Sequence, residues 1–347
     1  MLTWFAENKR ALPWRETSDP YRIWVSEVIL QQTRVAQGWA YYERFIAAFP
    51  TAEALAKAEE EDVLRLWQGL GYYSRARNMH RAAKQICELG AFPTTYAEIR
   101  ALSGIGDYTA AAISSIAYGL PTAVVDGNVY RVLSRFFADN TPIDSTQGKK
   151  HFAELAQALL PEKSPGVYNQ AIMDFGAMQC TPKSPKCDTC PLQQGCLASA
   201  RENVQTFPVK SKKTKVETRH MVYLIVHDTL GKTWLHQRQA GDIWQGLYEF
   251  PLLEFNAPPT LKDIKGHPFY QRCIPHEASF RNVTSSLTHQ LTHRLLKVDC
   301  YEIYVSEDTP VPEGFTAVLW ENLTDYPLPQ LIVRLTKLVK KAGSQQQ

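Results

Sequence analysis

Two patterns of apolar and polar residues divide the chain near residue 205. Before that point, apolar residues recur at the spacing of amphipathic helices, and short breaks that contain Gly or Pro separate the stretches. Strand-like alternation is scarce there. The pattern predicts one long helical stretch over 21–49, introduced by the capping pair Asp19-Pro20. Further helices are predicted over 51–68, 74–89 and 95–101, and after Gly106, Asp126, Thr146 and Gly166.

The second part of the chain has the pattern of an α/β domain. Strand-like runs lie at 220–227, 232–238 and 293–305, and an amphipathic helix is predicted over 330–341. Residues 203–219 are polar and basic, include Pro208 and predict a linker. We therefore expect a mainly α domain over 1–202 and an α/β domain over 220–342.

Composition narrows the class of protein. A chain of 347 residues suggests two domains, and 44% hydrophobic with 21% charged residues is ordinary for a globular protein. No apolar run approaches the roughly 18 residues of a membrane span. Residues 1–10 do not have the pattern of a signal peptide. We expect an intracellular protein that does not enter a membrane.

The net charge of +3 is too small to indicate a nucleic-acid partner by itself, but the basic excess is concentrated. Residues 210–219 carry five basic side chains and one acidic one. This segment is either a solvated linker or a linker that follows phosphates, and its composition leaves both open.

Four of the seven cysteines lie close together in the sequence. They are Cys180, Cys187, Cys190 and Cys196, with the spacing C-x6-C-x2-C-x5-C. An odd number of cysteines in an intracellular chain argues against a disulfide framework. Four thiolates in one short loop can hold either a 4Fe–4S cluster or a structural zinc ion, and the spacing alone does not decide between them.

A glycine-rich turn precedes one of the predicted helices. Gly104 and Gly106 flank Ile105, which allows a tight turn directly into a helix whose backbone N–H groups can bind a phosphate. We expect Leu102 and Ile105 to anchor this turn in the core.

The cysteine loop and this turn together resemble the endonuclease III superfamily of DNA repair glycosylases, which has an iron–sulfur loop and a helix-hairpin-helix. The resemblance implies a 4Fe–4S cluster without a catalytic role. It also implies an essential aspartate some 20 residues after the hairpin. Asp126 lies 18 residues after Tyr108 and matches this position. In isolation, Asp126 reads as a helix N-cap; in the family, this carboxylate stabilises positive charge on the deoxyribose.

Position 108 separates two subtypes of this superfamily. The bifunctional lyases have a lysine there, which attacks the sugar as an amine, whereas this chain has Tyr108. Because tyrosine cannot form a Schiff base, the resemblance implies a monofunctional enzyme that leaves an abasic site. Tyr108 and Asn128 are expected to orient Asp126 or the sugar.

Glu27 is the candidate general acid. It lies among apolar residues, and no Lys or Arg follows three or four positions later to form an intrahelical ion pair. The periodicity alone also permits an exposed helical glutamate. A buried carboxyl has a raised pKa, as an acid that works near neutral pH requires. The string SEVILQQT around Glu27 resembles the catalytic helix of adenine-specific glycosylases of the MutY type, which implies that Glu27 protonates adenine.

Other positions match that family one by one. The resemblance implies that Trp14 packs on the flipped base and that Arg15 reaches Glu27 or the base edge. Gln170 matches a residue that hydrogen-bonds the adenine edge. Gln32 and Tyr72, or Tyr73 in place of the latter, match residues that enter the base stack beside the orphan base.

The C-terminal part resembles the Nudix-like domain attached to these enzymes, most clearly at 242–251. Residues 252–270 lack the R-E-x-x-E-E string of a working Nudix hydrolase, so no pyrophosphohydrolase activity is expected. In the family, a short loop of this domain reads 8-oxoguanine. The corresponding residues are Thr292 and His293, and the similar pair Thr288 and His289 leaves the register open.

The sequence therefore predicts a monofunctional adenine DNA glycosylase of base excision repair. Its expected partner is double-stranded DNA with adenine opposite 8-oxoguanine or guanine, and the resemblance implies a monomer in the bacterial cytoplasm. Two alternatives remain at this point: an endonuclease III-like bifunctional lyase and a non-catalytic DNA damage-binding protein. Tyr108 argues against the first, and the presence of both Glu27 and Asp126 argues against the second.

Overall fold

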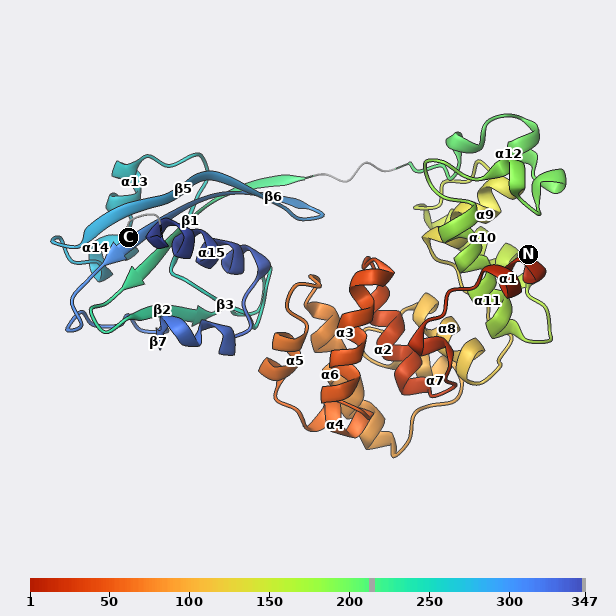
Figure 1. Cartoon of the computed structure of the whole chain (residues 1–347), viewed down its shortest axis with the longest axis horizontal. Coiled ribbons are helices and arrows are strands. Elements are labelled where there is room, and N and C mark those ends of the chain that lie inside the picture. The colour runs from red at the N-terminus through yellow and green to blue at the C-terminus, as the bar shows by residue number, and fades with distance from the viewer. Residues whose placement is uncertain (212–215, 345–347) are drawn as a thin grey trace. The chain divides into compact units, whose positions relative to one another are not determined.

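The computed structural model describes residues 1–211 and 216–344 (Figure 1). The chain forms two compact units. The first consists of Met1–Lys57 with Asn78–Lys213, and the second of Ala58–Arg77 with Thr214–Gln347. No helix in the described part of the chain is long and apolar enough to cross a membrane.

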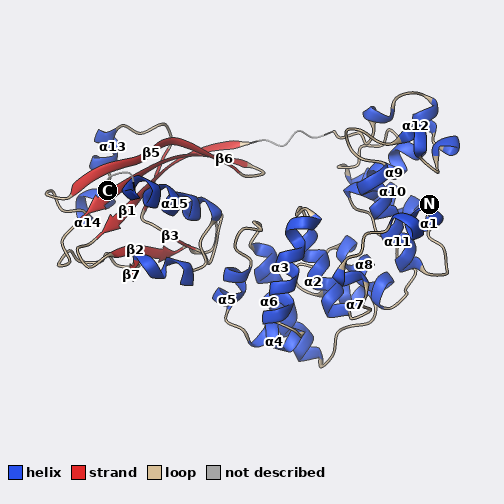
Figure 2. Cartoon of the chain, in the orientation of Figure 1, coloured by secondary structure: helices blue, strands red, loops and turns tan. Residues whose placement is uncertain are grey.

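The first unit is helical, and residues 1–211 contain no strand (Figure 2). Its helices are α1 (Leu2–Asn8), α2 (Pro20–Leu30), α3 (Val35–Ala48), α4 (Ala52–Lys57), α6 (Ser74–Leu89), α7 (Tyr96–Ala101), α8 (Asp107–Ala117), α9 (Gly127–Phe136), α10 (Thr146–Leu159), α11 (Pro165–Asp174) and α12 (Leu197–Ala200). The mainly α character of the N-terminal part is confirmed.

Two of the predicted helical stretches are each divided. The stretch over 21–49 forms α2 and α3, because Gln32 between them has φ of 60° and ends the helical path. The stretch over 51–68 forms α4 and α5 (Glu60–Leu66), and α5 belongs to the second unit. There Glu61 Oε1 accepts a hydrogen bond from the Tyr248 hydroxyl at 2.6 Å.

The second unit contains two sheets and is α/β, as predicted. The larger has the strand order β4-β1-β6-β5 and the smaller β3-β2-β7, and within residues 216–344 only β1 and β6 pair in parallel. The strands are β1 (Glu217–His227), β2 (Lys232–Gln237), β3 (Tyr248–Glu249), β4 (Leu252–Phe255), β5 (Ser279–Gln290), β6 (Arg294–Tyr304) and β7 (Thr316–Leu319). The helices are α5, α13 (Leu261–Gly266), α14 (Pro268–Cys273) and α15 (Gln330–Ser344).

Strand β1 is buried on both faces, which explains its continuous apolar run. Tyr223 and Ile225 pack in one cluster with Leu331 and Leu335 of α15. The alternate residues of β1, such as Leu224, pack in a second cluster that includes side chains of α13 and α14. Helices therefore cover both faces of the sheet.

Strand β5 was not predicted from the sequence. Its pairing with β6 shifts register between Asn282 and Thr284 and again between Thr284 and Leu287. Ser286 has φ of 56°. These bulges interrupt the two-residue alternation on which a strand prediction depends.

The predicted linker over 203–219 is shorter in the structure. Phe207 is buried, Arg135 Nε donates to the Val204 carbonyl at 2.9 Å, and Ile143 N donates to the Val209 carbonyl at 3.0 Å. This part of the segment therefore packs on the first unit, whereas residues from Glu217 onward belong to β1. Three of the basic residues of this predicted linker lie outside the described residues: Lys212, Lys213 and Lys215.

Candidate active site

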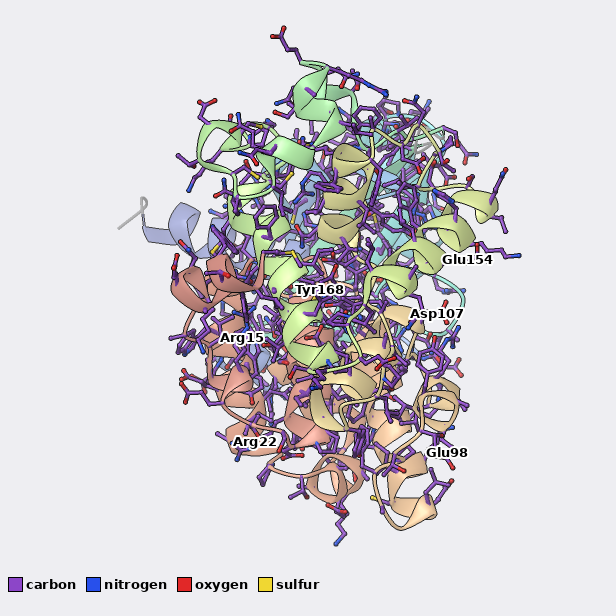
Figure 3. All side chains as sticks on the ribbon, turned by 90° about the vertical axis from the view of Figure 1, so that its right-hand side faces the viewer. Arg15, Arg22, Glu98, Asp107, Glu154 and Tyr168 are labelled. Carbon is purple, nitrogen blue, oxygen red and sulfur yellow. The ribbon has the colours of Figure 1, made fainter. Side chains whose placement is uncertain are left out.

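One cavity of about 1580 Å³ in the first unit brings together residues predicted from several separate motifs. The predicted residues that line it are Trp14, Arg15, Glu27, Gln32, Gly104, Gly106, Tyr108, Asp126, Asn128 and Gln170. Figure 3 labels three residues that line this cavity and come from different segments of the unit: Arg15, Asp107 and Glu154. Because these residues are far apart in the sequence, the fold assembles the site.

Glu27 lies on α2 and is buried, with 8% of its surface exposed. Burial raises its pKa to about 7, and the nearby Asp126 carboxylate also raises it. A hydrogen bond from the Tyr108 hydroxyl to Glu27 Oε2, 2.5 Å long, and the charge of Arg15 oppose that shift. A carboxyl with this pKa is partly protonated at neutral pH, so it can act as an acid.

Tyr108 contacts Glu27, whereas the sequence predicted that it orients Asp126 or the sugar. Tyr108 is the second residue of α8, and α8 packs on α2, the helix that carries Glu27. Its hydroxyl also lies 3.3 Å from the sulfur of Met173. Tyr108 therefore fixes the rotamer of the candidate acid.

Asp126 is the N-cap of α9 and also faces the cavity. Its Oδ1 accepts from the backbone N–H groups of Asn128 and Val129 at 2.9 and 2.8 Å, and its Oδ2 accepts from Asn128 Nδ2 at 2.7 Å. Burial raises the pKa of Asp126, and these hydrogen bonds together with the charge of Arg131 oppose the rise. The two hypotheses for Asp126, helix cap and active-site carboxylate, describe the same geometry.

Arg131 connects Asp126 to the cysteine loop and was not singled out from the sequence. Its guanidinium donates to Asn128 Oδ1 at 2.8 Å, to the Gly176 carbonyl at 2.5 Å and to the Cys180 carbonyl at 2.7 Å. The signal in the sequence that could have identified Arg131 is that an arginine lies on the apolar face of the amphipathic helix α9. The cysteine loop therefore supports Asn128 through Arg131, and Asn128 in turn holds Asp126.

Arg15 forms its ion pair with Asp174 rather than with Glu27. Arg15 Nη1 lies 2.6 Å from Asp174 Oδ2, and Arg10 pairs with the other oxygen of this fully buried carboxylate. Asp174 was missed because its partners are more than 150 residues away in the sequence. The ring of Trp14 packs edge-on against Tyr42, with centroids 5.1 Å apart.

The glycine-rich turn has the predicted form at Gly104. Gly104 has φ of 73°, and a Cβ there would meet Asn78 at 2.5 Å. Leu102 and Ile105 are buried, as predicted. Gly106 caps α8 with an ordinary φ of −92°, and a Cβ there would meet no atom within 4 Å. No steric contact within the described residues therefore requires a glycine at position 106. The space beside Gly106, at the start of α8, is open to a group from outside the chain.

Three predicted residues lie together in the second unit. Tyr72 is 45% exposed with φ of 47°, and its hydroxyl forms a hydrogen bond with Thr292 Oγ1. Thr292 and His293 are exposed in the turn between β5 and β6. Thr288 and His289 lie within β5 instead. Thr288 is also exposed, but Thr292 is the threonine whose side chain is hydrogen-bonded to Tyr72.

The four clustered cysteines form no disulfide and line one small cavity together with Arg135. Within the described residues, no three His, Cys, Asp or Glu side chains converge as the ligands of a single metal ion do. A tetrahedral zinc site needs sulfurs that all lie about 2.3 Å from one ion, whereas a 4Fe–4S cluster takes one thiolate on each of four separated irons. The residues present therefore fit the cluster better than zinc.

Comparison with known proteins connects both units to a single family. The model of the HhH-GPD superfamily base excision DNA repair protein matches residues 25–161, the iron-sulfur binding domain of endonuclease III matches 180–196, and the NUDIX domain matches 221–338. An adenine DNA glycosylase of Buchnera aphidicola is 36% identical over 346 residues, covering 98% of this chain and 97% of the relative. This chain belongs to the adenine DNA glycosylases.

Further comparisons agree with this assignment. The human adenine DNA glycosylase is 44% identical, with 100% of this chain and 74% of that protein covered. The structure of a thermostable thymine-DNA glycosylase has 30% identity and a TM-score of 0.54 over 58% of this chain and 93% of its own. A trapped endonuclease III–DNA intermediate, 22% identical with a TM-score of 0.51, shares the fold.

The family confirms three predictions made from the sequence. The glycosylase has an endonuclease III-like helical part and a Nudix-like C-terminal part, so the predicted fold class is confirmed. Its cysteine loop holds a 4Fe–4S cluster. The enzyme is a DNA N-glycosylase of base excision repair.

Proposed function

We propose that this enzyme removes adenine from duplex DNA in which adenine is opposite 8-oxoguanine or guanine, and that Glu27 and Asp126 carry the reaction. The flipped adenine enters the cavity that both carboxylates line. The lesion-reading part is the turn that contains Thr292 and His293, beside Tyr72. In this proposal, Gln32 and Tyr72 enter the base stack, and Gln170, Trp14 and Arg15 hold the adenine.

The different surroundings of the two carboxylates support their different roles. Asp126 accepts three hydrogen bonds from N–H donors, which stabilise its charged form. Glu27 has one hydroxyl donor and a pKa of about 7. When two neighbouring carboxyls share a proton, the less stabilised one holds it, so the proton belongs on Glu27.

The reaction proceeds in two steps under this assignment. Glu27 donates its proton to a ring nitrogen of adenine, N7 by preference, and thereby makes the base a neutral leaving group. The glycosidic electrons leave with the base, and the Asp126 carboxylate stabilises the cationic sugar until water adds to C1′ and gives its proton to the ionised Glu27. Because Tyr108 cannot form an imine with that carbon, the strand is left intact at an abasic site.

The observation that carries this proposal is the pair of carboxyls itself, of which Glu27 is buried and Asp126 half-buried. Two carboxyls whose surroundings separate their protonation states face one cavity large enough for a base. Neither the cluster nor the Nudix-like part supplies such a pair in that cavity. The cluster contributes no step, and its loop supports Asp126 through Arg131 and Asn128.

A single-turnover cleavage assay with one adenine opposite 8-oxoguanine tests the proposal. We expect strand breaks only after hot alkali, and a rate from Glu27→Gln that is lower by about 10²- to 10⁴-fold. Glu154→Gln is the matched control, because Glu154 lines the same cavity but its side chain is 67% exposed. Breaks without alkali would instead indicate a lyase. Absence of cleavage by cluster-loaded enzyme would favour a damage-binding protein.

We further propose that the enzyme works as a monomer wherever the chromosome lies, which in a bacterium is the cytoplasm. The residues assigned to catalysis all come from one chain and line one cavity. Sedimentation of the enzyme on a duplex with a single mispair tests the first statement, with one enzyme per duplex expected.

A further inference from the structure

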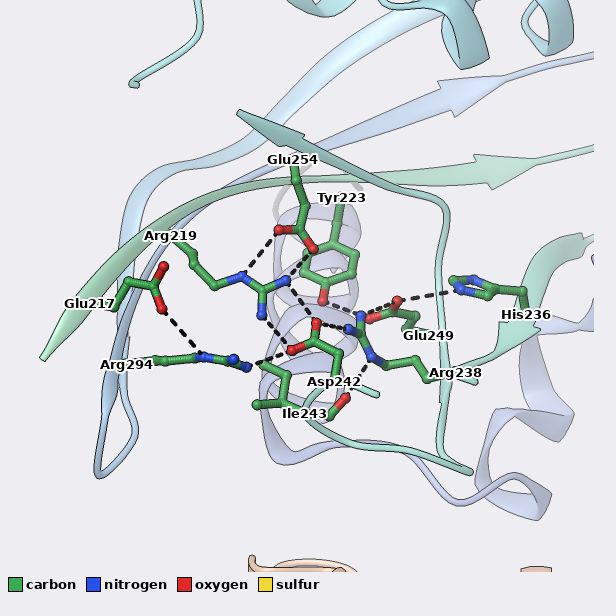
Figure 4. Close-up of polar contacts among 10 residues, drawn as sticks. All are labelled: Glu217, Arg219, Tyr223, His236, Arg238, Asp242, Ile243, Glu249, Glu254 and Arg294. Atoms are coloured by element: carbon green, nitrogen blue, oxygen red, sulfur yellow. Dashed lines mark hydrogen bonds and ion pairs between the residues drawn. The ribbon is translucent and has the colours of Figure 1, made fainter. Parts of the chain in front are cut away.

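A group of charged side chains in the second unit surrounds Asp242 (Figure 4). Arg219 binds both oxygens of Asp242, each at 2.8 Å. Arg238 reaches Oδ2 at 2.6 Å and Arg294 reaches Oδ1 at 2.5 Å. Burial raises the pKa of Asp242, but the hydrogen bonds and charge of Arg219, a hydrogen bond from the Ile243 backbone and the hydrogen bond from Arg294 hold it far below its usual range.

Each of the three arginines also has a second carboxylate partner. Arg219 pairs with Glu254. Arg238 pairs with the buried Glu249 at 2.5 Å. Arg294 pairs with Glu217 at 3.9 Å. Asp242 is therefore not needed to neutralise any one of them. Among the described residues, it alone contacts all three, so its distinctive contribution is to connect them.

The three arginines come from separate parts of the sheet structure. Arg219 lies on β1 and Arg238 directly follows β2. Arg294 is the first residue of β6 and directly follows Leu291, Thr292 and His293, the turn of the β5–β6 hairpin. The turn is closed by a hydrogen bond from Leu291 N to the Arg294 carbonyl at 2.8 Å. Asp242 thus fixes the base of this turn to β1 and β2.

Asp242 also begins a loop that supports the hairpin. Trp244 in this loop has φ of 62°, a conformation that costs roughly 1–3 kcal/mol for a bulky residue. Arg238 holds the loop, because its Nε donates to the Ile243 carbonyl at 2.8 Å and its backbone N–H donates to the Leu247 carbonyl at 2.9 Å. The Trp244 ring lies 6.1 Å from that of His289 on β5 and packs in the apolar cluster that Leu291 joins.

We propose that Asp242 is a positioning residue that sets the place of Thr292 and thereby the preference for the base opposite adenine. It acts through Arg294 and the turn, without contact to DNA. This inference rests on the proposed function, in which the turn with Thr292 reads 8-oxoguanine.

The test measures the subsaturating single-turnover rate on adenine opposite 8-oxoguanine and opposite guanine, together with the rates at saturating enzyme. Asp242→Asn is expected to lower the 8-oxoguanine preference of the subsaturating rate on the order of tenfold and to leave the saturating rates unchanged. Arg294→Gln, which removes the link from Asp242 to the hairpin together with the pair with Glu217, is expected to do the same. Glu254→Gln, which removes another partner of Arg219, is the matched control and is expected to keep the preference.

A double variant separates positioning from general stability. If Asp242 acts through the turn, Asp242→Asn combined with Thr292→Ala discriminates no worse than Thr292→Ala alone. Additive losses, an equal loss on both substrates, or unfolding of both Asp242→Asn and Arg294→Gln would overturn the inference.

The wild-type and Thr292→Ala results report separately on the proposed function. A wild-type enzyme that cleaves both duplexes without preference for 8-oxoguanine would overturn this inference alone, whereas a wild type that cleaves neither duplex would reject the proposed function. If wild type has the preference and Thr292→Ala loses it while Asp242→Asn keeps it, the inference alone fails.

Discussion

Glu27 in the first unit and Asp242 in the second show how surroundings decide what a carboxylate does. Glu27 is almost fully buried, has no hydrogen bond from a cation among the described contacts, and has its pKa raised to about 7. Asp242 is less buried, binds three guanidinium groups and has its pKa strongly lowered. The first can exchange a proton near neutral pH, and the second stays charged and holds the structure together. Burial without a cation thus makes a reactive acid, and cations make a structural link.

The largest effect is expected at Glu27. General acid catalysis contributes about 10²- to 10⁴-fold, so Glu27→Gln should lower the single-turnover rate by that factor. Asp242→Asn should leave the rate at saturating enzyme intact. Rapid-quench kinetics on the same duplex measures both. If the two variants lose activity equally, the division between reactive and structural carboxylates is wrong.

The stability of the two variants should change in opposite directions. The ordinary pKa of Glu27 is 4.5 and the folded value is about 7, so the folded protein loses stability as the pH rises from the first value to the second. Glu27→Gln removes a penalty on the order of 3 kcal/mol at pH values above about 7. Asp242→Asn should lower stability instead. Urea unfolding at several pH values tests this, and equal stability of Glu27→Gln and wild type above neutrality would contradict the raised pKa.

A smaller loss is expected from Asp126→Asn. Removal of one preorganised charge-stabilising group costs about 10²- to 10³-fold in rate. An asparagine at this position can still cap α9, because its side-chain oxygen accepts from the backbone N–H groups of Asn128 and Val129. Circular dichroism should show an unchanged helix content beside the reduced rate. A rate near that of wild type would remove Asp126 from the mechanism.

Arg131→Met should destabilise the first unit by roughly 3 kcal/mol. It leaves the oxygens of Asn128, Gly176 and Cys180 without this donor, and buried unsatisfied acceptors cost about 1–3 kcal/mol each. Visible absorbance of the cluster followed during urea titration reports on the cysteine loop. Arg201→Met, at an exposed position after α12, is the control and should behave as wild type. Equal midpoints for both variants would show that the link from cluster loop to Asp126 carries no stability.

The smallest effect is expected from Tyr108→Phe. The Tyr108 hydroxyl stabilises the ionised form of Glu27 and so lowers its pKa. Its loss should raise that pKa by less than about one unit, since such a hydrogen bond contributes about 1 kcal/mol. The pH–rate profile should move to higher pH by the same amount. A shift to lower pH would show that the hydroxyl serves the protonated form instead.

The sequence predicted most of the structural features that depend on a few neighbouring residues. Helix starts at Asp19 and Asp126, the turn at Gly104 and the four cysteines each carry a signal within a few residues. Several helices, such as α6 at 74–89, have the predicted bounds. The acidic and sugar-stabilising candidates Glu27 and Asp126 were found because their motifs are short and specific, and the structure places both in one cavity.

What the sequence could not predict depends on distant partners. Asp174 can be recognised as the shared ion-pair partner of Arg10 and Arg15 only when the fold places the three side chains together. Arg15 was expected to reach Glu27 or the base edge, and its ion pair with Asp174 could not be foreseen for the same reason. Strand β5 was hidden by its bulges, and the place of α5 in the second unit depends on side chains such as Tyr248, far along the chain.

The pH dependence of base excision tests the central claim about Glu27 most directly. The single-turnover rate constant of wild type at saturating enzyme should be level at acidic pH and fall about tenfold per pH unit above about 7. The residual activity of Glu27→Gln should lack that fall. A wild-type rate constant that stays level or rises between roughly pH 6 and pH 9 would contradict the assignment of Glu27 as the acid.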